Sequence, residues 1–142
     1  PPVTPQALEI FFQAWEDHGL RVSDLLLENI QGNDLRTIWP VIRGSQCGLC
    51  LDLGHLLLYS QQEILNQPGF LDQLRMLHIY GTDETDSRHG PLSRLSFKDQ
   101  GVLRGLLQAL PSQGVVVIEV FSAQDLFASL DIFNTWIRNW TL

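Results

Sequence analysis

Four side chains of the types that bind divalent metals each end a short apolar run of the sequence: Glu28, Asp52, His78 and Glu119. Near-continuous runs of Leu, Val and Ile are typical of strands buried on both faces, as in a parallel sheet. Because the carboxyl ends of parallel strands meet at one rim, we expect the four side chains to converge. Several buried ionisable groups in one place are costly unless an opposite charge lies between them. The pattern therefore predicts a divalent-metal site, since carboxylates and imidazoles suit zinc, manganese, iron or magnesium.

Each of these residues also has a purely structural interpretation when it is considered alone. Asp52 is placed to cap the helix expected after it, and His78 could be a core histidine. His55, three residues after Asp52, could hydrogen-bond within its own turn, and His89 lies in a polar loop where histidines are ordinarily solvated. The metal site is favoured because these structural explanations do not account for the strand-end residues as a group.

The two cysteines, Cys47 and Cys50, form a Cys-x-x-Cys pair at the entry to an expected strand. Redox pairs of this kind instead follow a strand, at a helix N-terminus that lowers the thiol pKa. A structural zinc site needs two more ligands of that kind nearby, and the sequence has none there. Cys50 shares strand parity with Asp52, so we expect its side chain to pack inward without a chemical role.

The elements that must position these residues follow a regular order. Thr4 and Pro5 are typical of a helix start, and Gly19 of its end. Four strand-then-helix units follow. Pro40 is expected to kink or shorten the first of their helices, and residues 60–63 to form a capping box within the second. Residues 81–95 are a polar loop too long for a simple connection.

This order predicts an α/β fold with parallel strands and outer helices, in which residues 1–142 form a single α(βα)4 unit. A (β/α)8 TIM barrel needs about 250 residues, so the chain supplies about half of one. The alternative is a small four-stranded doubly wound sheet. The chain begins with Pro1 and not with Met, which suggests a processed or truncated product. A half barrel leaves strand edges open, so we expect it to pair with its missing N-terminal half or with another copy of itself.

Composition and charge bound the class of protein. The chain is 44% hydrophobic and 18% charged, as in ordinary globular domains, and its net charge is −7. This acidic balance argues against a nucleic acid partner, because phosphate backbones are bound mainly by Lys and Arg. The sequence has no apolar run of membrane-spanning length and no signal-peptide pattern at its start. We therefore predict a cytoplasmic protein without a membrane partner.

The order and spacing of five short motifs resemble the xylose-isomerase-like TIM barrel superfamily. The motifs are Leu-Glu-Asn at 27–29, Asp-Leu-Gly-His at 52–55, Leu-His at 77–78, Arg-His-Gly-Pro-Leu at 88–92 and Ile-Glu-Val at 118–120. This superfamily includes sugar-phosphate isomerases and epimerases, the type 2 apurinic-site endonucleases such as endonuclease IV, and the cobamide-remodelling phosphohydrolases. The resemblance covers nearly the whole chain and implies that it is the C-terminal half, strands five to eight, of such a barrel.

The resemblance also implies roles for individual residues. The central metal ligands of the superfamily match the four strand-end residues named first above. In isomerase and epimerase relatives, Glu28 and Glu119 also match the acid/base pair. In hydrolytic relatives, Glu28 matches a bridging ligand, and the histidines that match His55 and His89 join a further metal. The implied cofactor is one to three divalent ions, such as zinc, manganese, iron or cobalt.

Three functions remain open. Hydrolysis of a phosphoester, as in the cobamide-remodelling branch, is favoured by His89 and its His-Gly-Pro-Leu context, and Arg88 and Arg94 could hold a phosphate. Isomerisation or epimerisation of a sugar phosphate needs one metal and two opposed carboxylates, which Glu28 and Glu119 supply. The third is a non-catalytic half barrel with an incomplete site. The sequence places metal-dependent hydrolysis of a small-molecule substrate first.

Overall fold

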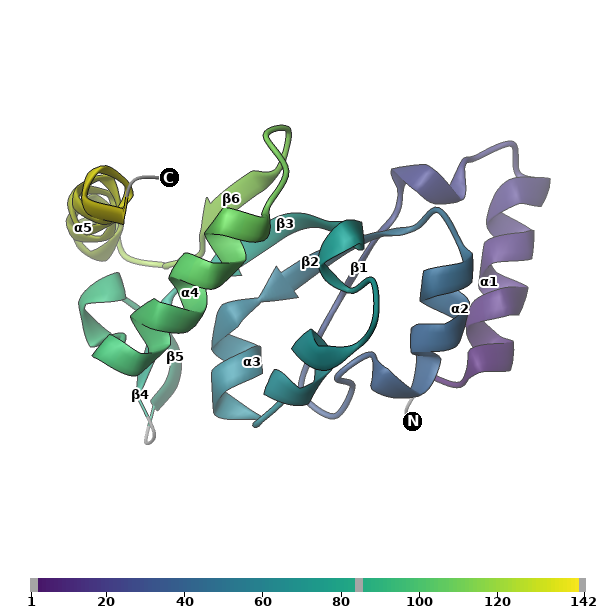
Figure 1. The fold of residues 1–142 in the computed structure, drawn as a ribbon, viewed down its shortest axis with the longest axis horizontal. Helices are drawn as coiled ribbons and strands as arrows, with labels where there is room; N and C mark the ends of the chain where they lie inside the picture. Colours follow the sequence, from purple (N-terminus) through teal and green to yellow (C-terminus); the bar gives the residue numbers. More distant parts are fainter. Residues whose placement is uncertain (1–2, 84–85, 141–142) are drawn as a thin grey trace.

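The computed structural model describes residues 3–83 and 86–140, with the backbone alone at residues 83 and 86–88. Its main sheet contains four parallel strands, which are β1 (Leu26–Glu28), β2 (Gly48–Asp52), β3 (Leu74–Ile79) and β6 (Val115–Ile118) (Figure 1). The strand order across the sheet is β1-β2-β3-β6. Neighbouring strands in the sheet are therefore also successive parallel strands in the chain, as in a segment of a barrel wall.

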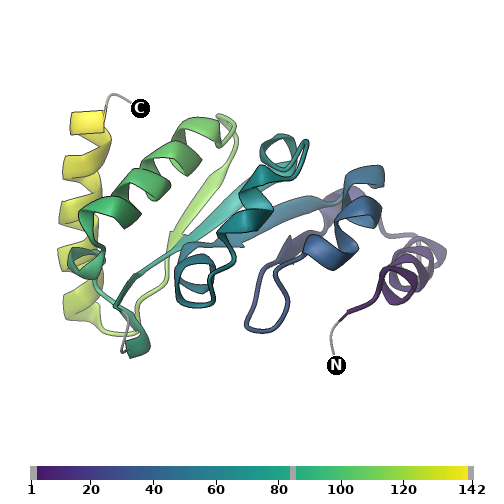
Figure 2. The ribbon, with the colours of Figure 1, turned by 60° about the horizontal axis from the view of Figure 1, so that its bottom comes forward.

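Helices flank this sheet along its whole width. The α-helices of the described residues are α1 (Pro5–Asp17), α2 (Trp39–Gly44), α3 (Leu53–Leu58), α4 (Phe97–Ala109) and α5 (Ala123–Trp140). Shorter 3-10 helices occupy Val22–Asp24 (η1), Arg36–Ile38 (η2), Gln62–Asn66 (η3), Leu71–Gln73 (η4) and Leu92–Arg94 (η5). Helix α1 packs against α2 near the β1 end of the sheet, and α5 lies against β6 at the other end, as both views show (Figures 1 and 2).

The core is centred on the two inner strands of the sheet. Every residue of β2 is buried, and Leu49, Leu51 and Leu77 are inaccessible to solvent. The outer strands differ, since Leu26 of β1 is 39% exposed and Val115 of β6 is 46% exposed. The expectation of strands buried on both faces therefore holds for β2 but not for β1 and β6, which are the edges of the described sheet. In the described ranges, no helix combines the length and the apolar character needed to cross a membrane.

The first helix begins and ends as the sequence predicts. The hydroxyl oxygen of Thr4 accepts a hydrogen bond from the N–H of Ala7 at 3.2 Å, and Pro5 follows it as the first helical residue. The helix ends before Gly19, which adopts a φ of +75° that a residue with a side chain rarely tolerates.

Three connections differ from the sequence-based expectations. Pro40 lies in the first turn of α2, where no N–H is needed, so it does not kink this helix; α2 is nevertheless short, with six residues, as the other half of the expectation states. Residues 60–63 form no capping box, because Ser60 has a φ of +53° and η3 begins without a side-chain cap. The polar segment after His78 contains an antiparallel hairpin of β4 (Gly81–Asp83) and β5 (Asp86–Gly90), which gives it a defined backbone.

Candidate metal centre

The parallel register brings the four strand-end residues to one rim of the sheet. Glu28 is the last residue of β1 and Asp52 the last residue of β2. His78 lies directly opposite Asp52 in the neighbouring strand β3. Glu119 follows β6, and its backbone N–H donates to the carbonyl of Ile79 at 2.9 Å, which continues the pairing of β3 with β6. Four successive parallel strands therefore each deliver one potential ligand to the same place.

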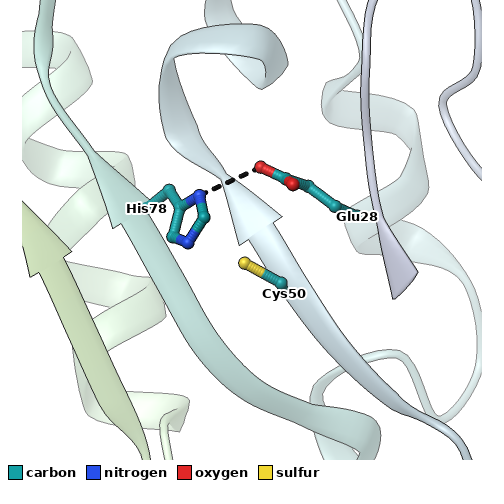
Figure 3. Close-up of side chains that lie close together, drawn as sticks. All are labelled: Glu28, Cys50 and His78. Carbon is teal, nitrogen blue, oxygen red and sulfur yellow. Dashed lines mark ion pairs between the residues drawn. The ribbon is translucent and has the colours of Figure 1, made fainter. Parts of the chain in front are cut away.

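His78 lies between the two glutamates. Its Nδ1 is 3.0 Å from Oε1 of Glu28 (Figure 3) and 3.4 Å from Oε2 of Glu119. The same nitrogen is buried, and the described part of the chain offers it no partner with hydrogen-bond geometry. One imidazole nitrogen is therefore close to two carboxylates without being committed to a hydrogen bond.

Asp52 is the most deeply buried of the four, with 1% of its surface exposed. Its Oδ1 accepts the backbone N–H of His55 at 2.7 Å and so caps α3, which is the structural role that its position predicts. Its Oδ2 has no hydrogen-bond partner among the described residues. Burial raises the pKa of this carboxyl, and the N–H of His55 opposes that rise. One oxygen of Asp52 thus caps α3, and the other has no hydrogen-bond partner among the described residues.

These donor atoms are close enough together to hold a divalent ion. Three overlapping groups of residues each offer three ligand atoms that lie within 4.8 Å of one another. The groups are Asp52 with His78 and Glu119, Glu28 with Asp52 and His55, and Glu28 with Cys50 and His78. Buried polar atoms normally have a hydrogen-bond partner, which Oδ2 of Asp52 and Nδ1 of His78 lack within the described structure. A cation would supply a partner to both atoms. The oxygen and nitrogen donors at this rim therefore fit zinc, manganese, iron or cobalt.

His55 and His89 contact different members of this cluster. Nδ1 of His55 is 2.9 Å from the carbonyl oxygen of Asn29 and 3.4 Å from Oδ2 of Asp52. Nε2 of His89 is 3.5 Å from Oε2 of Glu119. No set of three or more close ligand atoms, among the residues that the structure describes, contains both histidines. The structure does not bring them together at one further metal position.

Tyr80 belongs to this site, although the sequence does not single it out. Its ring is fully buried and packs against the ring of His89, with the two centroids 3.9 Å apart and the ring planes tilted by 31°. Burial raises the pKa of the phenol, and the charge of Asp52 raises it further. The ring passes so close to Gly54 that a Cβ at that position would lie 2.0 Å from Cζ of Tyr80. Tyr80 therefore helps to hold His89 beside Glu119.

The structure places only one of the two arginines that were predicted to bind a phosphate. The side chain of Arg88 lies outside the described residues. Arg94 is exposed in η5, and its side chain covers Gly90. Arg94 also lines a separate pocket of about 490 Å³ with Thr82 and Lys98, and the described lining of that pocket includes none of the predicted metal ligands. This pocket beside Arg94 is thus distinct from the metal centre.

Asn29 is a second residue whose importance only the structure reveals. Its side chain is fully buried and makes two hydrogen bonds to the backbone of Asp52, accepting from the N–H at 2.7 Å and donating to the carbonyl at 3.0 Å. It also donates to the side chain of Gln61 at 2.9 Å. The amide continues the pairing of β1 with β2 beyond the last strand residue and thereby fixes the position of Asp52.

We expect Asn29→Ala to destabilise the fold and to weaken metal binding together. Each buried group that loses its hydrogen bond costs about 1–3 kcal/mol, and the substitution leaves the backbone N–H and carbonyl of Asp52 without their partner. Urea unfolding and metal titration of the same sample would measure both effects. Asn134→Ala, at an exposed position of α5, is the matched control; it should leave metal affinity unchanged and should not lower stability, since alanine favours the helix. Unchanged metal affinity in Asn29→Ala would show that the amide does not position Asp52.

No family model and no curated protein matches this chain. Among solved structures, it is similar to the crystal structure of a D-tagatose 3-epimerase-like protein, with a TM-score of 0.68 and 18% sequence identity. The match covers 96% of this chain and 54% of that chain, so this chain spans about half the length of the protein it matches. The chain has the fold of part of a TIM barrel.

This finding confirms the predicted α/β class with parallel strands and outer helices. It also decides against the doubly wound alternative, in which the strand order reverses at a switch point, because the order β1-β2-β3-β6 has no such reversal within the described sheet. The chain is an incomplete unit of this fold, since the matched barrel contains nearly as much chain again. At this level of identity the likeness establishes the fold and leaves the chemistry to the site itself.

Proposed function

We propose that this partial barrel carries the metal centre and the acid/base pair of a sugar isomerase or epimerase. The observation that carries the proposal is the position of Glu28 and Glu119, which approach Nδ1 of His78 from the two edge strands to 3.0 and 3.4 Å. Two carboxylates on either side of one metal position are suited to moving a proton beside a carbonyl group. The fold shared with a D-tagatose 3-epimerase-like protein supports the same chemistry.

The side chains of the site would have separate roles in this proton transfer. A divalent ion at the rim would polarise the carbonyl and hydroxyl oxygens of a bound ketose. One glutamate would remove the proton from the carbon beside the carbonyl, and the other would return a proton to the neighbouring atom or to the opposite face. His78 lies 3.0 Å from Glu28 and would hold the ion beside it, and His89 lies 3.5 Å from Glu119 and would help to position that carboxylate. Asp52 is held rigidly by the cap of α3 and so serves as a fixed ligand.

Phosphoester hydrolysis, the first choice from sequence, now has less support than isomerisation. It relied on His55 and His89 acting together at a further metal. His55 lies with Glu28 and Asp52, whereas His89 lies with Glu119. Glu28 and Glu119 instead both approach Nδ1 of His78, so a metal position beside that residue accounts for this arrangement with fewer ions, and we therefore place the isomerase or epimerase first.

We also propose that a complementary half closes the barrel. Strands β1 and β6 are the edges of the described sheet, and each presents a partly exposed apolar residue, Leu26 and Val115. Open edges of this kind pair readily with further strands. The added strands would come either from a longer form of the same chain or from a second copy.

Hydrogen exchange into ketoses tests the proposed function directly. The native protein is loaded with Mn²⁺ or Co²⁺ and incubated in heavy water with free ketoses and ketose phosphates, and deuterium beside the carbonyl is followed by nuclear magnetic resonance. We expect metal-dependent exchange that Glu119→Gln abolishes, because the amide cannot accept the proton. Glu9→Gln, at an exposed position of α1, is the control and should retain the activity. Metal-dependent phosphoester cleavage without exchange would establish hydrolysis instead. If the protein showed neither activity, the non-catalytic module would be the remaining function.

A further inference from the structure

The thiol of Cys50 lies beside two of the potential metal ligands, Glu28 and His78. Cys50 precedes Asp52 by two residues in β2, so both side chains point to the same face of the sheet. Cys50 is opposite Glu28 in the register of β1 and β2, and its side chain is 4% exposed. Figure 3 shows its sulfur beside the carboxylate of Glu28 and the ring of His78, and the three ligand atoms lie within 4.8 Å of one another.

The neighbouring cysteine shows that this placement is specific to Cys50. The thiol of Cys47 contacts two backbone carbonyls, those of Leu25 at 3.5 Å and Gly48 at 3.4 Å, and Cys47 belongs to none of the close ligand sets found among the described residues. Burial raises the pKa of Cys47 to about 11. Burial and the charges of Glu28, Asp52 and Glu119 raise the pKa of Cys50 to about 12, so both are neutral thiols before any ion binds.

We propose that Glu28, Cys50 and His78 form a second, softer ion position that binds a thiophilic divalent ion, Zn²⁺ or Cd²⁺. Sulfur, nitrogen and oxygen donors are a usual set for tetrahedral zinc, and sulfur ligands discriminate against Mg²⁺ and Mn²⁺. Neighbouring donors around such an ion are roughly 3.5 Å apart, so small rotations of these side chains suffice to reach it. Coordination replaces the thiol proton, which is released to solvent.

The two ion positions share His78, and they therefore compete. An ion held by Cys50 withdraws His78 from the rim position, where Asp52, His78 and Glu119 offer only oxygen and nitrogen, and it also occupies Glu28. Soft ions should consequently displace Mn²⁺ or Co²⁺ from the rim and inhibit the reaction. This regulatory consequence rests on the proposed function, whereas the binding of a soft ion at Cys50 does not.

Cadmium titration of the metal-free protein tests the inference by a signal that only sulfur ligation gives. We expect an ultraviolet sulfur-to-cadmium charge-transfer band, and its loss in Cys50→Ser and Cys50→Ala. Cadmium affinity in these variants should fall by more than about tenfold, because even residues outside the ligand shell change metal affinity about 10–100-fold. Cys47→Ser removes the other thiol of the pair and should keep the band. Circular dichroism establishes that each variant is folded.

Several outcomes would overturn the inference. These are cadmium binding without the band, a band that persists in both Cys50 variants, and a band that is lost in Cys47→Ser. Failure of the proposed function is distinguishable, since it appears as Mn²⁺-loaded protein without hydrogen exchange while the cadmium band is present. Exchange activity without any band would reject the soft position and leave the isomerase or epimerase intact.

Discussion

Asp52→Asn is expected to remove rim metal binding while making the metal-free protein more stable. The carboxylate is almost completely buried, and one of its oxygens has no hydrogen-bond partner among the described residues. Burial raises the pKa of Asp52 in the folded protein above its value in the unfolded chain. Its contribution to stability is therefore fully present at low pH and is lost as the pH rises through the folded-state pKa. At neutral pH the charge is a cost, which the neutral amide avoids while still capping α3.

Calorimetric metal titration and thermal unfolding at neutral pH measure the two effects of Asp52→Asn. We expect Mn²⁺ affinity to fall by more than about tenfold and the Tm of the metal-free variant to rise. Asp17→Asn, at an exposed position near the end of α1, is the control and should leave both unchanged. Retained metal affinity would contradict the role of Asp52 as a ligand. A lower Tm would contradict the argument that its buried charge opposes folding.

Gly54→Ala is expected to destabilise the protein although alanine favours helices. The added Cβ would lie 2.0 Å from Cζ and 2.3 Å from the hydroxyl oxygen of Tyr80, whose buried ring has little freedom to move. Overpacking of this kind costs about 1–3 kcal/mol. The displaced ring would also carry His89 away from Glu119, so activity should fall with stability.

Urea unfolding provides the measurement, and the chain offers a matched control. Gly105 is exposed in the interior of α4, and a Cβ there would meet nothing within 4 Å. Gly105→Ala should therefore stabilise the protein by about 0.5–1 kcal/mol through helix propensity alone. Equal stabilisation by both substitutions would mean that Tyr80 does not confine Gly54.

The strand ends were predictable because the residues that define them are adjacent in the sequence. An apolar run followed by Glu28, Asp52 or His78 indicates both a buried parallel strand and a polar group at its carboxyl end. The barrel segment follows from repeating that pattern. The kind of reaction was less predictable, because His55 and His89 look equivalent in the sequence and only the structure separates them.

Other features of the site depend on contacts between distant segments. The amide of Asn29 could not be assigned to the backbone of Asp52 without the register of β1 and β2. The same register turns Cys50 from an expected core residue into a neighbour of Glu28. Tyr80 was missed because its role arises from its contact with His89 across the hairpin, and the sequence showed that hairpin only as a long polar segment.

The strand order has a consequence for how the site is assembled during translation. Each parallel strand pairs with the preceding one, so the sheet can grow strand by strand as the ribosome releases the chain. Glu28, Cys50 and His78 are all synthesised well before Glu119, which follows the hairpin and α4. Of these two donor sets, the one that contains Cys50 is therefore synthesised before the one that contains Glu119. A cell that loads this centre with manganese or cobalt would have to keep zinc away until the last strand is in place.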